Sequence, residues 1–310
     1  MTKQSNLGSA YDVLWDVLET IRFRGSIFFH SELSAPWGVA FSALSIPRFH
    51  IALSGNLLVG TDTDTPHPLK QGEVIMIPSG TPHWAADQPG RTLVESETVG
   101  QACELNSPLF QVGDTTHHLM CGLVRYDENL DHPIFSALPE LLHFPEPALE
   151  DGVWNTILLI DREIERKKSH SSPVIDRLTE ALFIQLLEAY VDNHQHNTGF
   201  LAALGEPRLA HALTLIHHNP QMNGTLDDLG KKIGMSKATL NRHFQQMVGI
   251  APMAYIRNWK MIKAKSWVCY SNMTLEKIAD KVGFSSAGAM SKAFFRHYQQ
   301  TPGQIRRGES

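Results

Sequence analysis

The chain has 310 residues, of which 42% are hydrophobic and 19% charged, a globular composition that excludes long disordered regions and suits about two domains. Its net charge of −5 is unevenly divided: residues 207–310 carry 15 Lys and Arg against 5 Asp and Glu, whereas residues 1–206 carry 12 against 27. A part with a net charge of +10 beside one of −15 indicates one domain that meets a polyanion and one that does not. The alternative is a chance segregation of solvated charges.

The cysteine count and the N-terminal sequence indicate the compartment. The three cysteines, Cys103, Cys121 and Cys269, are odd in number and share no spacing, which argues against a disulfide framework and fits a reducing compartment. The first 20 residues lack a basic segment followed by an apolar one, so no secretory signal is expected. No stretch approaches the roughly 18 apolar residues of a membrane span. We therefore expect a cytoplasmic protein with no membrane partner.

Short apolar runs separated by turn residues fill the N-terminal part, up to about residue 125. The clearest runs are residues 49–53, 57–59 and 74–77. The separators are rich in glycine, proline, serine and asparagine, as in Ser54-Gly55-Asn56 and Pro78-Ser79-Gly80. Many short strands with regular turn signals predict a β-sandwich or β-barrel.

One segment of this β-rich part carries a motif. Residues 72–83 read GEVIMIPSGTPH and fit the pattern G-x5-P-x-G-x2-H. The pattern predicts a strand, a sharp turn at the Pro and Gly residues, and a second strand that projects His83 into the barrel. It is similar to the second motif of the cupin β-barrel superfamily, and the resemblance implies a cupin-like barrel. The last Asn of that motif would fall at Asp87, so this position departs from it.

The first cupin motif is poorly kept. Its paired metal-binding His-x-His is absent, and Arg48 stands where its Glu would lie. His50 follows two residues later on the same strand face, from which His83 could approach it across the barrel. Cys121 lies in the apolar run 119–124 and could join them, and two His with a Cys suit a zinc-like divalent metal. The alternative, which we favour, is that all three are ordinary barrel residues or line a plain ligand pocket.

Two tryptophans are candidates for the same pocket. We expect Trp37 and Trp84, with His50 and His83, to bind a small effector, although tryptophan is equally expected in a barrel core. The cupin resemblance also brings in metal-dependent dioxygenases and isomerases, whose metal is held by three His and a Glu. Most of that ligand set is missing here. No nucleophile elbow, Gly-rich phosphate loop or pair of catalytic carboxylates stands out, so no catalytic residue is predicted.

The pattern then changes from strands to helices. Residues 153–168 and 174–193 place apolar residues at helical spacing, which predicts a helical pair that packs on the barrel or on another copy of the chain. A polar stretch follows at 192–199 and contains His194 and His196. A solvated linker explains it better than a metal site, because no partner ligands are evident. We therefore expect a first domain over 1–195 and a linker over 196–206.

From residue 207 the pattern is helical to the end. Thr225 can cap a helix whose apolar face carries Leu226, Leu229 and Ile233, and Gly234 can end that helix in a tight turn. Ser236 then caps a helix over 237–248. Its apolar stripe comprises Leu240, Phe244, Met247 and Val248, and Ala238, Asn241, Arg242 and Gln245 lie opposite. Asn, Arg and Gln pair bidentately with adenine or guanine, so this is the helix-turn-helix pattern of DNA-binding proteins.

The pattern recurs about fifty residues later. Residues 274–286 repeat the Thr cap, acidic first turn, Gly turn and Ser start, and the following helix offers Met290, Phe294 and Phe295 to a core. Between the two units, residues 253–270 predict one long helix that carries several basic residues, and residues 302–307 predict a short basic helix. Two such units in a domain of net charge +10 favour DNA binding over a generic helical bundle.

Residues 207–307 resemble the DNA-binding domain of the AraC/XylS family of transcription regulators. The segments SKATLNRHFQQMVGIAP and IADKVGFSSAGAMSKAFFRHYQQTPGQIRR carry the resemblance, and the segment CGLVRYDENLDHPIFSALPELLHF extends it to a subgroup with this sensor. The family places the second helix of each unit in successive major grooves. The resemblance therefore implies these DNA-binding residues: Ser236, Lys237, Ala238, Asn241, Arg242 and Gln245 at the first groove; Ser286, Ala287, Gly288, Ser291 and Lys292 at the second.

The second reading helix departs from a base reader because it starts Ala287-Gly288-Ala289. Such small side chains cannot hydrogen-bond to base edges. We therefore expect the second unit to position the protein through phosphate contacts more than it reads sequence.

The whole pattern predicts a multidomain chain: a cupin-like β-barrel with added helices, and an all-α DNA-binding domain over 207–310 with two helix-turn-helix units joined by a long helix. We expect a sequence-specific transcription regulator, an activator by family resemblance, that responds to a small effector in the barrel. Double-stranded promoter DNA, RNA polymerase and a second copy of the chain are the expected partners. The alternatives are a metal-dependent cupin enzyme with an accessory DNA-binding domain and an architectural DNA binder with a filled barrel.

Overall fold

The computed structural model describes residues 2–61, 65–104, 109–127, 132, 134, 138–145, 151–167, 169, 172–193, 199–221 and 225–308. His194 and His196 lie outside the described residues, as does the side chain of Cys103. The chain divides into two compact units, one of residues 23–126 and 138–193, and one of residues 1–22, 127–137 and 194–310. No described helix is both long and apolar enough to cross a membrane.

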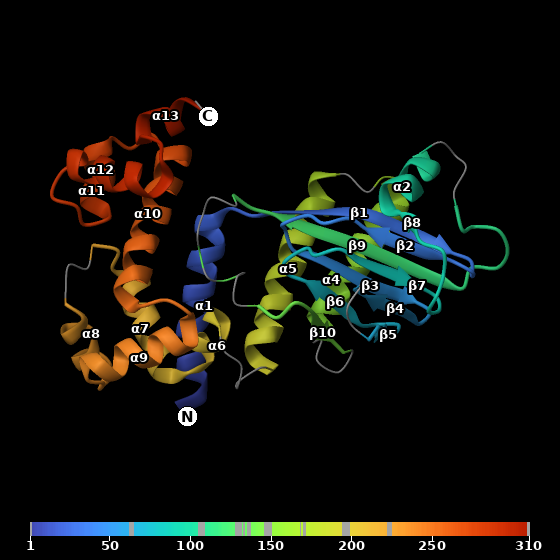
Figure 1. The fold of residues 1–310 in the computed structure, drawn as a ribbon, viewed down its shortest axis with the longest axis horizontal. Coiled ribbons are helices and arrows are strands. Elements are labelled where there is room, and N and C mark those ends of the chain that lie inside the picture. The colour runs from blue at the N-terminus through green and yellow to red at the C-terminus, as the bar shows by residue number, and fades with distance from the viewer. Residues whose placement is uncertain are drawn as a thin grey trace. The chain divides into compact units, whose positions relative to one another are not determined.

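The first unit is built on two five-stranded sheets (Figure 1). The first sheet has the order β1 (Arg24–Leu33), β9 (His117–Arg125), β3 (Arg48–Ser54), β6 (Val74–Ile77), β10 (Leu142–Phe144). The second has the order β5 (His67–Leu69), β4 (Leu57–Gly60), β7 (His83–Ala86), β2 (Gly38–Phe41), β8 (Val94–Glu95). All pairs are antiparallel except β2 with β8. The predicted cupin-like β fold is thus present as a two-sheet sandwich, and the three apolar runs are β3, β4 and β6.

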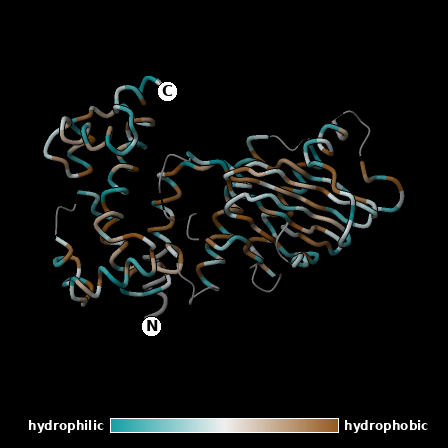
Figure 2. The backbone as a smooth tube through the Cα atoms, viewed as in Figure 1, coloured by the Kyte–Doolittle hydropathy of each residue, from teal (hydrophilic) through white to brown (hydrophobic). Residues whose placement is uncertain are grey.

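The core of this unit lies between the sheets and is apolar, with Phe29, Phe41, Val59, Ile75 and Leu119 among its members. Figure 2 shows hydrophobic residues running along the strands of the sandwich. Successive residues of a strand face opposite sides, so His30, next to Phe29, faces the outside of the first sheet.

Helices cover that outer side. The predicted helical pair is confirmed as α4 (Asp151–Lys167) and α5 (Pro173–Asn193), which pack on each other, and α5 also packs on β1. The approach is close at Gly25, where an added Cβ would lie 2.8 Å from backbone and side-chain atoms of Thr179 and Glu180. Only glycine leaves that space free, which fixes where α5 crosses β1. A shorter helix, α2 (Ser96–Glu104), packs on β2 and β8.

The second unit is helical. Its described helices are α1 (Thr2–Ile21), α6 (Phe200–Gly205), α7 (Pro207–His218), α8 (Leu226–Ile233), α9 (Lys237–Val248), α10 (Pro252–Tyr270), α11 (Leu275–Lys281), α12 (Ala287–Tyr298) and α13 (Pro302–Arg307). Helix α10 contacts α9 as well as α11, α12 and α13, so it joins the two helix pairs (Figure 1). The predicted long helix and terminal helix are confirmed.

Two parts of this unit differ from the sequence-based expectation. The N-terminal part was expected to be β-rich, but α1 is a helix of 20 residues that packs on α6, α7 and α10. Its buried side chains have helical spacing: Val13, Leu14, Val17, Leu18 and Ile21. Residues 200–205, expected in the linker, form α6, in which Phe200–Leu204 are buried. A buried helix forms here because five apolar side chains in a row gain more from packing than from water contact.

Candidate nucleic-acid interface

The first helix pair of the second unit is fixed by local capping. Thr225 and Asp228 form a capping box at the start of α8, which satisfies free N–H groups there. Gly234 ends α8 with φ 68°, a left-handed conformation that favours glycine. Ser236 accepts a hydrogen bond from the backbone N–H of Thr239 and starts α9. These predicted caps are confirmed, and they set the angle at which α9 leaves the turn.

Helix α9 has one buried and one exposed face. Leu240, Phe244 and Val248 are buried, as expected, whereas Met247 is only half-buried. All six residues predicted to meet the first major groove are exposed: Ser236, Lys237, Ala238, Asn241, Arg242 and Gln245. The Ser236 hydroxyl is held by the cap, which leaves Lys237, Asn241, Arg242 and Gln245 as the long polar side chains of this set.

The second pair repeats the arrangement. Thr274 caps α11, and Gly283 has φ 75° in the turn that follows. Ser286 caps α12 through the N–H of Ala289, 3.1 Å from its oxygen. Of the residues predicted to meet the second groove, Ser286, Gly288 and Lys292 are exposed, and Ala287 and Ser291 are half-buried.

One core prediction in α12 is wrong. Met290 and Phe294 are buried, but Phe295 is 49% exposed. Adjacent helical residues point about 100° apart, so a core on one side can take only one member of the Phe294-Phe295 pair. Phe295 instead shares the exposed stripe of Gly288 and Lys292, at spacings of seven and three residues. The sequence-based assignment missed it as a surface residue, although the helical period contains the signal.

The basic residues of the long helix have separate roles. Lys263 forms an ion pair with Asp16, and Lys265 is buried with its Nζ 2.6 Å from Asp127. Arg257 remains exposed, and with Lys260 and Arg296 it lines a cleft of about 440 Å³ between α10 and α12. Burial lowers the pKa of Lys260. Three cationic side chains beside α12 form a surface that suits phosphate oxygens.

The interior of the sandwich brings three predicted residues together. Cys121 Sγ lies 2.9 Å from His50 Nδ1, and His50 Nε2 lies 2.8 Å from His83 Nε2. His83 Nδ1 lies 2.6 Å from the carbonyl oxygen of Thr81, so this nitrogen must carry the proton that it donates. His83 Nε2 then accepts from His50 Nε2–H, and His50 Nδ1 accepts from the Cys121 thiol. All three polar groups are satisfied in their neutral forms.

Burial and a nearby charge keep these three hydrogen-bonded side chains neutral. Burial lowers the pKa of His50 well below its usual value and lowers the pKa of His83 to about 4, and the Arg48 guanidinium adds to both effects. Burial also raises the pKa of the Cys121 thiol well above its usual value. His50 presents opposite ring nitrogens to its two partners, so the donor atoms do not converge on one point. The arrangement of His50, His83 and Cys121 is a hydrogen-bonded relay of buried side chains.

The remaining effector candidates are separated. Trp37 is buried in the core and donates its indole N–H to His117 Nδ1 at 3.1 Å. Trp84 follows His83 in β7 and therefore faces the opposite side of the second sheet. Its ring covers Gly60 on the neighbouring strand, where an added Cβ would lie 2.6 Å from it. Trp84 thus does not share the space of His50 and His83.

Arg48 is the interior residue that the effector prediction left out. Its side chain is buried, and its Nη1 donates to the carbonyl oxygen of Ser42 at 2.6 Å. Its Nε has no hydrogen-bond partner among the described residues. A buried guanidinium with an unused donor is costly unless something completes it.

Comparisons with known proteins cover both units. A family model described as Cupin matches residues 12–192, and one described as Helix-turn-helix domain matches residues 229–308. The HTH-type transcriptional regulator AlkR of Acinetobacter baylyi is 26% identical over 302 residues, covering 95% of this chain and 99% of its own. The HTH-type transcriptional regulator MtrA of Neisseria gonorrhoeae is 25% identical, covering 96% and 98%. A transcriptional regulator from Chromobacterium violaceum with an AraC-type DNA-binding domain has a solved structure 26% identical, with a TM-score of 0.31, covering 34% of this chain and 94% of that one.

Proposed function

Because the chain belongs to the family of AraC-like transcriptional regulators that join a cupin domain to a helix-turn-helix DNA-binding domain, we propose that it activates transcription when a small effector binds inside its cupin domain. Activation is the sign that family resemblance favours. In this proposal the protein acts in the cytoplasm as a homodimer that contacts RNA polymerase, and it catalyses no reaction. The relatives named as regulators along nearly their whole length support regulation over catalysis.

We assign effector binding and dimerisation to the part of residues 1–195 that follows α1, and DNA binding to residues 207–310. Helices α1 and α6 pack in the same compact unit as the DNA-binding helices and complete that domain. Helices α4 and α5 are the elements through which we expect two copies to meet. Effector binding can shift the protein toward activation only if it favours one arrangement of the domains over the other.

The exposed stripe of α9 carries this proposal. Arg242 and Asn241 are exposed on a helix whose opposite face is buried, and both side chains can form bidentate hydrogen bonds with a base. On α12 the exposed Gly288 offers no side chain, and Lys292 suits a phosphate. We therefore assign different roles to the two helices, with α9 reading bases and α12 fixing the register.

Selection of bound sequences from random DNA duplexes by the full-length protein tests these two roles. We expect a site with two blocks about one helical turn apart, one strongly and one weakly specified. Arg242→Ala should flatten the base preference of the strong block. Lys292→Ala should weaken binding about equally for all sequences and reduce its salt dependence. If Lys292→Ala alters base preference as much as Arg242→Ala, the assignment of roles is wrong.

The buried Arg48 side chain indicates the charge of the effector: we propose that the effector carries a negative charge. An anion beside Arg48 would use the free Nε donor and offset the cost of a buried cation. A thermal-shift panel of small carboxylic acids and their matching amides tests this. At least one acid should stabilise the wild-type protein while its amide does not, and Arg48→Met should remove the shift. Stabilisation by amides and acids alike would refute the charge requirement.

A further inference from the structure

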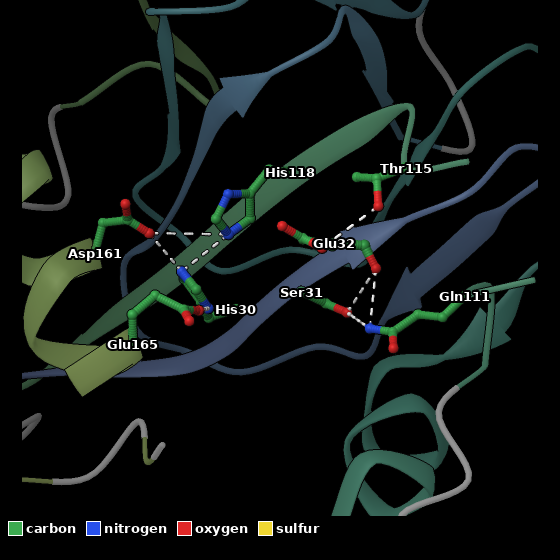
Figure 3. Close-up of polar contacts among 8 residues, drawn as sticks. All are labelled: His30, Ser31, Glu32, Gln111, Thr115, His118, Asp161 and Glu165. Atoms are coloured by element: carbon green, nitrogen blue, oxygen red, sulfur yellow. Dashed lines mark hydrogen bonds and ion pairs between the residues drawn. The ribbon is translucent and has the colours of Figure 1, made fainter. Parts of the chain in front are cut away.

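A second histidine cluster lies on the outer side of the first sheet, opposite α4 (Figure 3). His30 on β1 pairs in register with Met120 on β9, so His118 is its diagonal neighbour on the same face. Asp161 of α4 points at both rings (Figure 3). Its Oδ1 lies 2.8 Å from His30 Nε2 and 3.9 Å from His118 Nε2, and the two Nε2 atoms are 3.0 Å apart.

These distances fit a metal ion. A point equidistant from three atoms at these separations lies about 2.0 Å from each, which is the length of a Zn–N or Zn–O bond. Within the part of the chain that the structure describes, this is the one trio of His, Cys, Asp or Glu residues that brings its ligand atoms within 4.8 Å of one another. The convergence on one point distinguishes it from the relay of His50, His83 and Cys121.

Hydrogen bonding alone satisfies the trio poorly. A neutral imidazole nitrogen is either a donor or an acceptor. If His30 Nε2–H donates to Asp161, this nitrogen has no lone pair with which to accept a hydrogen bond from His118. Its single proton is already directed at the carboxylate, although the two Nε2 atoms are 3.0 Å apart. A cation accepts a lone pair from all three atoms at once.

The surroundings also suit a metal. The side chains of His30, His118 and Asp161 are 5%, 17% and 23% exposed, which leaves a path for a water as the fourth ligand. Glu165, one turn beyond Asp161 on α4, has its Oε1 3.9 Å from His30 Nδ1. A carboxylate near the second nitrogen of a ligating histidine orients the ring in many metal sites.

We propose that His30, His118 and Asp161 bind a divalent transition metal of the zinc class. Two imidazoles and one carboxylate favour such ions over Mg²⁺ or Ca²⁺. The ion joins α4 to strands β1 and β9, so metal binding stabilises the packing of this helix on the sheet. The site does not depend on DNA binding or on an effector in the sandwich.

Titration of the full-length, chelator-treated protein with Zn²⁺ against a chromophoric competitor tests the site. We expect the wild-type protein to bind one equivalent that His118→Asn and Asp161→Asn bind at least about 100-fold more weakly, with a smaller loss, about 10-fold, in Glu165→Gln. His143→Asn is the matched control, because His143 pairs with Glu73 at 2.9 Å on the same sheet and, among the described residues, belongs to no group of three metal-ligand side chains. Equal titration of all these proteins would overturn the proposal.

Two further readouts separate binding from folding. Zn²⁺ should raise the melting temperature of the wild type and of His143→Asn but not of His118→Asn or Asp161→Asn, all compared with their metal-free forms. With Co²⁺ alone, the wild type should show visible bands of a four-coordinate nitrogen and oxygen site. A thiolate charge-transfer band that Cys121→Ser removes would place the metal at the interior relay instead, and would also overturn the proposal.

Discussion

At the scale of single residues, the neutral relay inside the sandwich makes stability depend on pH. The folded state holds the pKa of His83 at about 4, below its usual 6.5. A lowered histidine pKa contributes stability that is complete above pH 6.5 and is lost as pH falls toward 4, because the unfolded chain binds the proton first. The shift corresponds to at most about 3 kcal/mol for His83 alone.

We predict that urea unfolding of the wild-type protein shows a free energy that falls from pH 7 to pH 5, and that His83→Gln reduces this slope. Gln can still donate to the Thr81 carbonyl and accept from His50, so the variant should fold. The measurement is the difference in slope between the wild type and His83→Gln, because the two proteins share every other titratable residue. A variant with an unchanged slope would show that His83 is not held neutral.

At the scale of elements, helix α12 places neighbouring phenylalanines on different faces. We predict that Phe295→Ala weakens DNA binding by about fivefold while leaving stability within about 0.5 kcal/mol, because an exposed ring can contact a thymine methyl group but supports no core. Phe294→Ala is the matched control and should cost about 3–5 kcal/mol of stability. Electrophoretic mobility shifts and thermal melting measure the two effects. Loss of stability in Phe295→Ala would show that the Phe295 side chain contributes to core packing.

The elements that the sequence predicted well are those with local signals. The boundaries of α8, α9 and α13 depend on caps and glycine turns within a few residues of each other, and α10 starts at Pro252, so neighbouring sequence suffices. Helix α1 also has helical spacing of its apolar residues, but its partners lie about 200 positions away, and the strand-like pattern that follows obscured it. The same limit applies to His30, His118 and Asp161, which only the packing of α4 on the sheet brings together.

At the scale of the whole molecule, α1 is part of the DNA-binding unit. Asp16 accepts from Lys263 and, at 2.8 Å, from His217. Tyr255 contacts the other nitrogen of His217 at 2.6 Å, which continues the network into α10. Burial alone would raise the pKa of Asp16, but its bonds to His217 and Lys263 outweigh that and lower it.

We therefore predict that a fragment of residues 199–310 is less stable and binds DNA more weakly than the same fragment fused through a flexible linker to residues 1–22. Without α1, apolar surface on α7 and α10 is exposed, and Lys263 loses its partner. Thermal melting and DNA titration of the two fragments test this. A fused copy carrying Asp16→Asn should fall between them, and equal behaviour of all three would show that α1 is dispensable.

The position of α1 also orders events during synthesis. The ribosome makes residues 11–21 before the sandwich, and their partners on α7 and α10 after it. The cupin unit can fold once residue 193 has emerged, whereas the DNA-binding unit must keep the apolar side of α1 uncovered for all of that time. The DNA-binding unit is thus the last part of the molecule to become competent, and its assembly closes a chain segment of 247 residues, from Asp16 to Lys263, that includes an already folded domain.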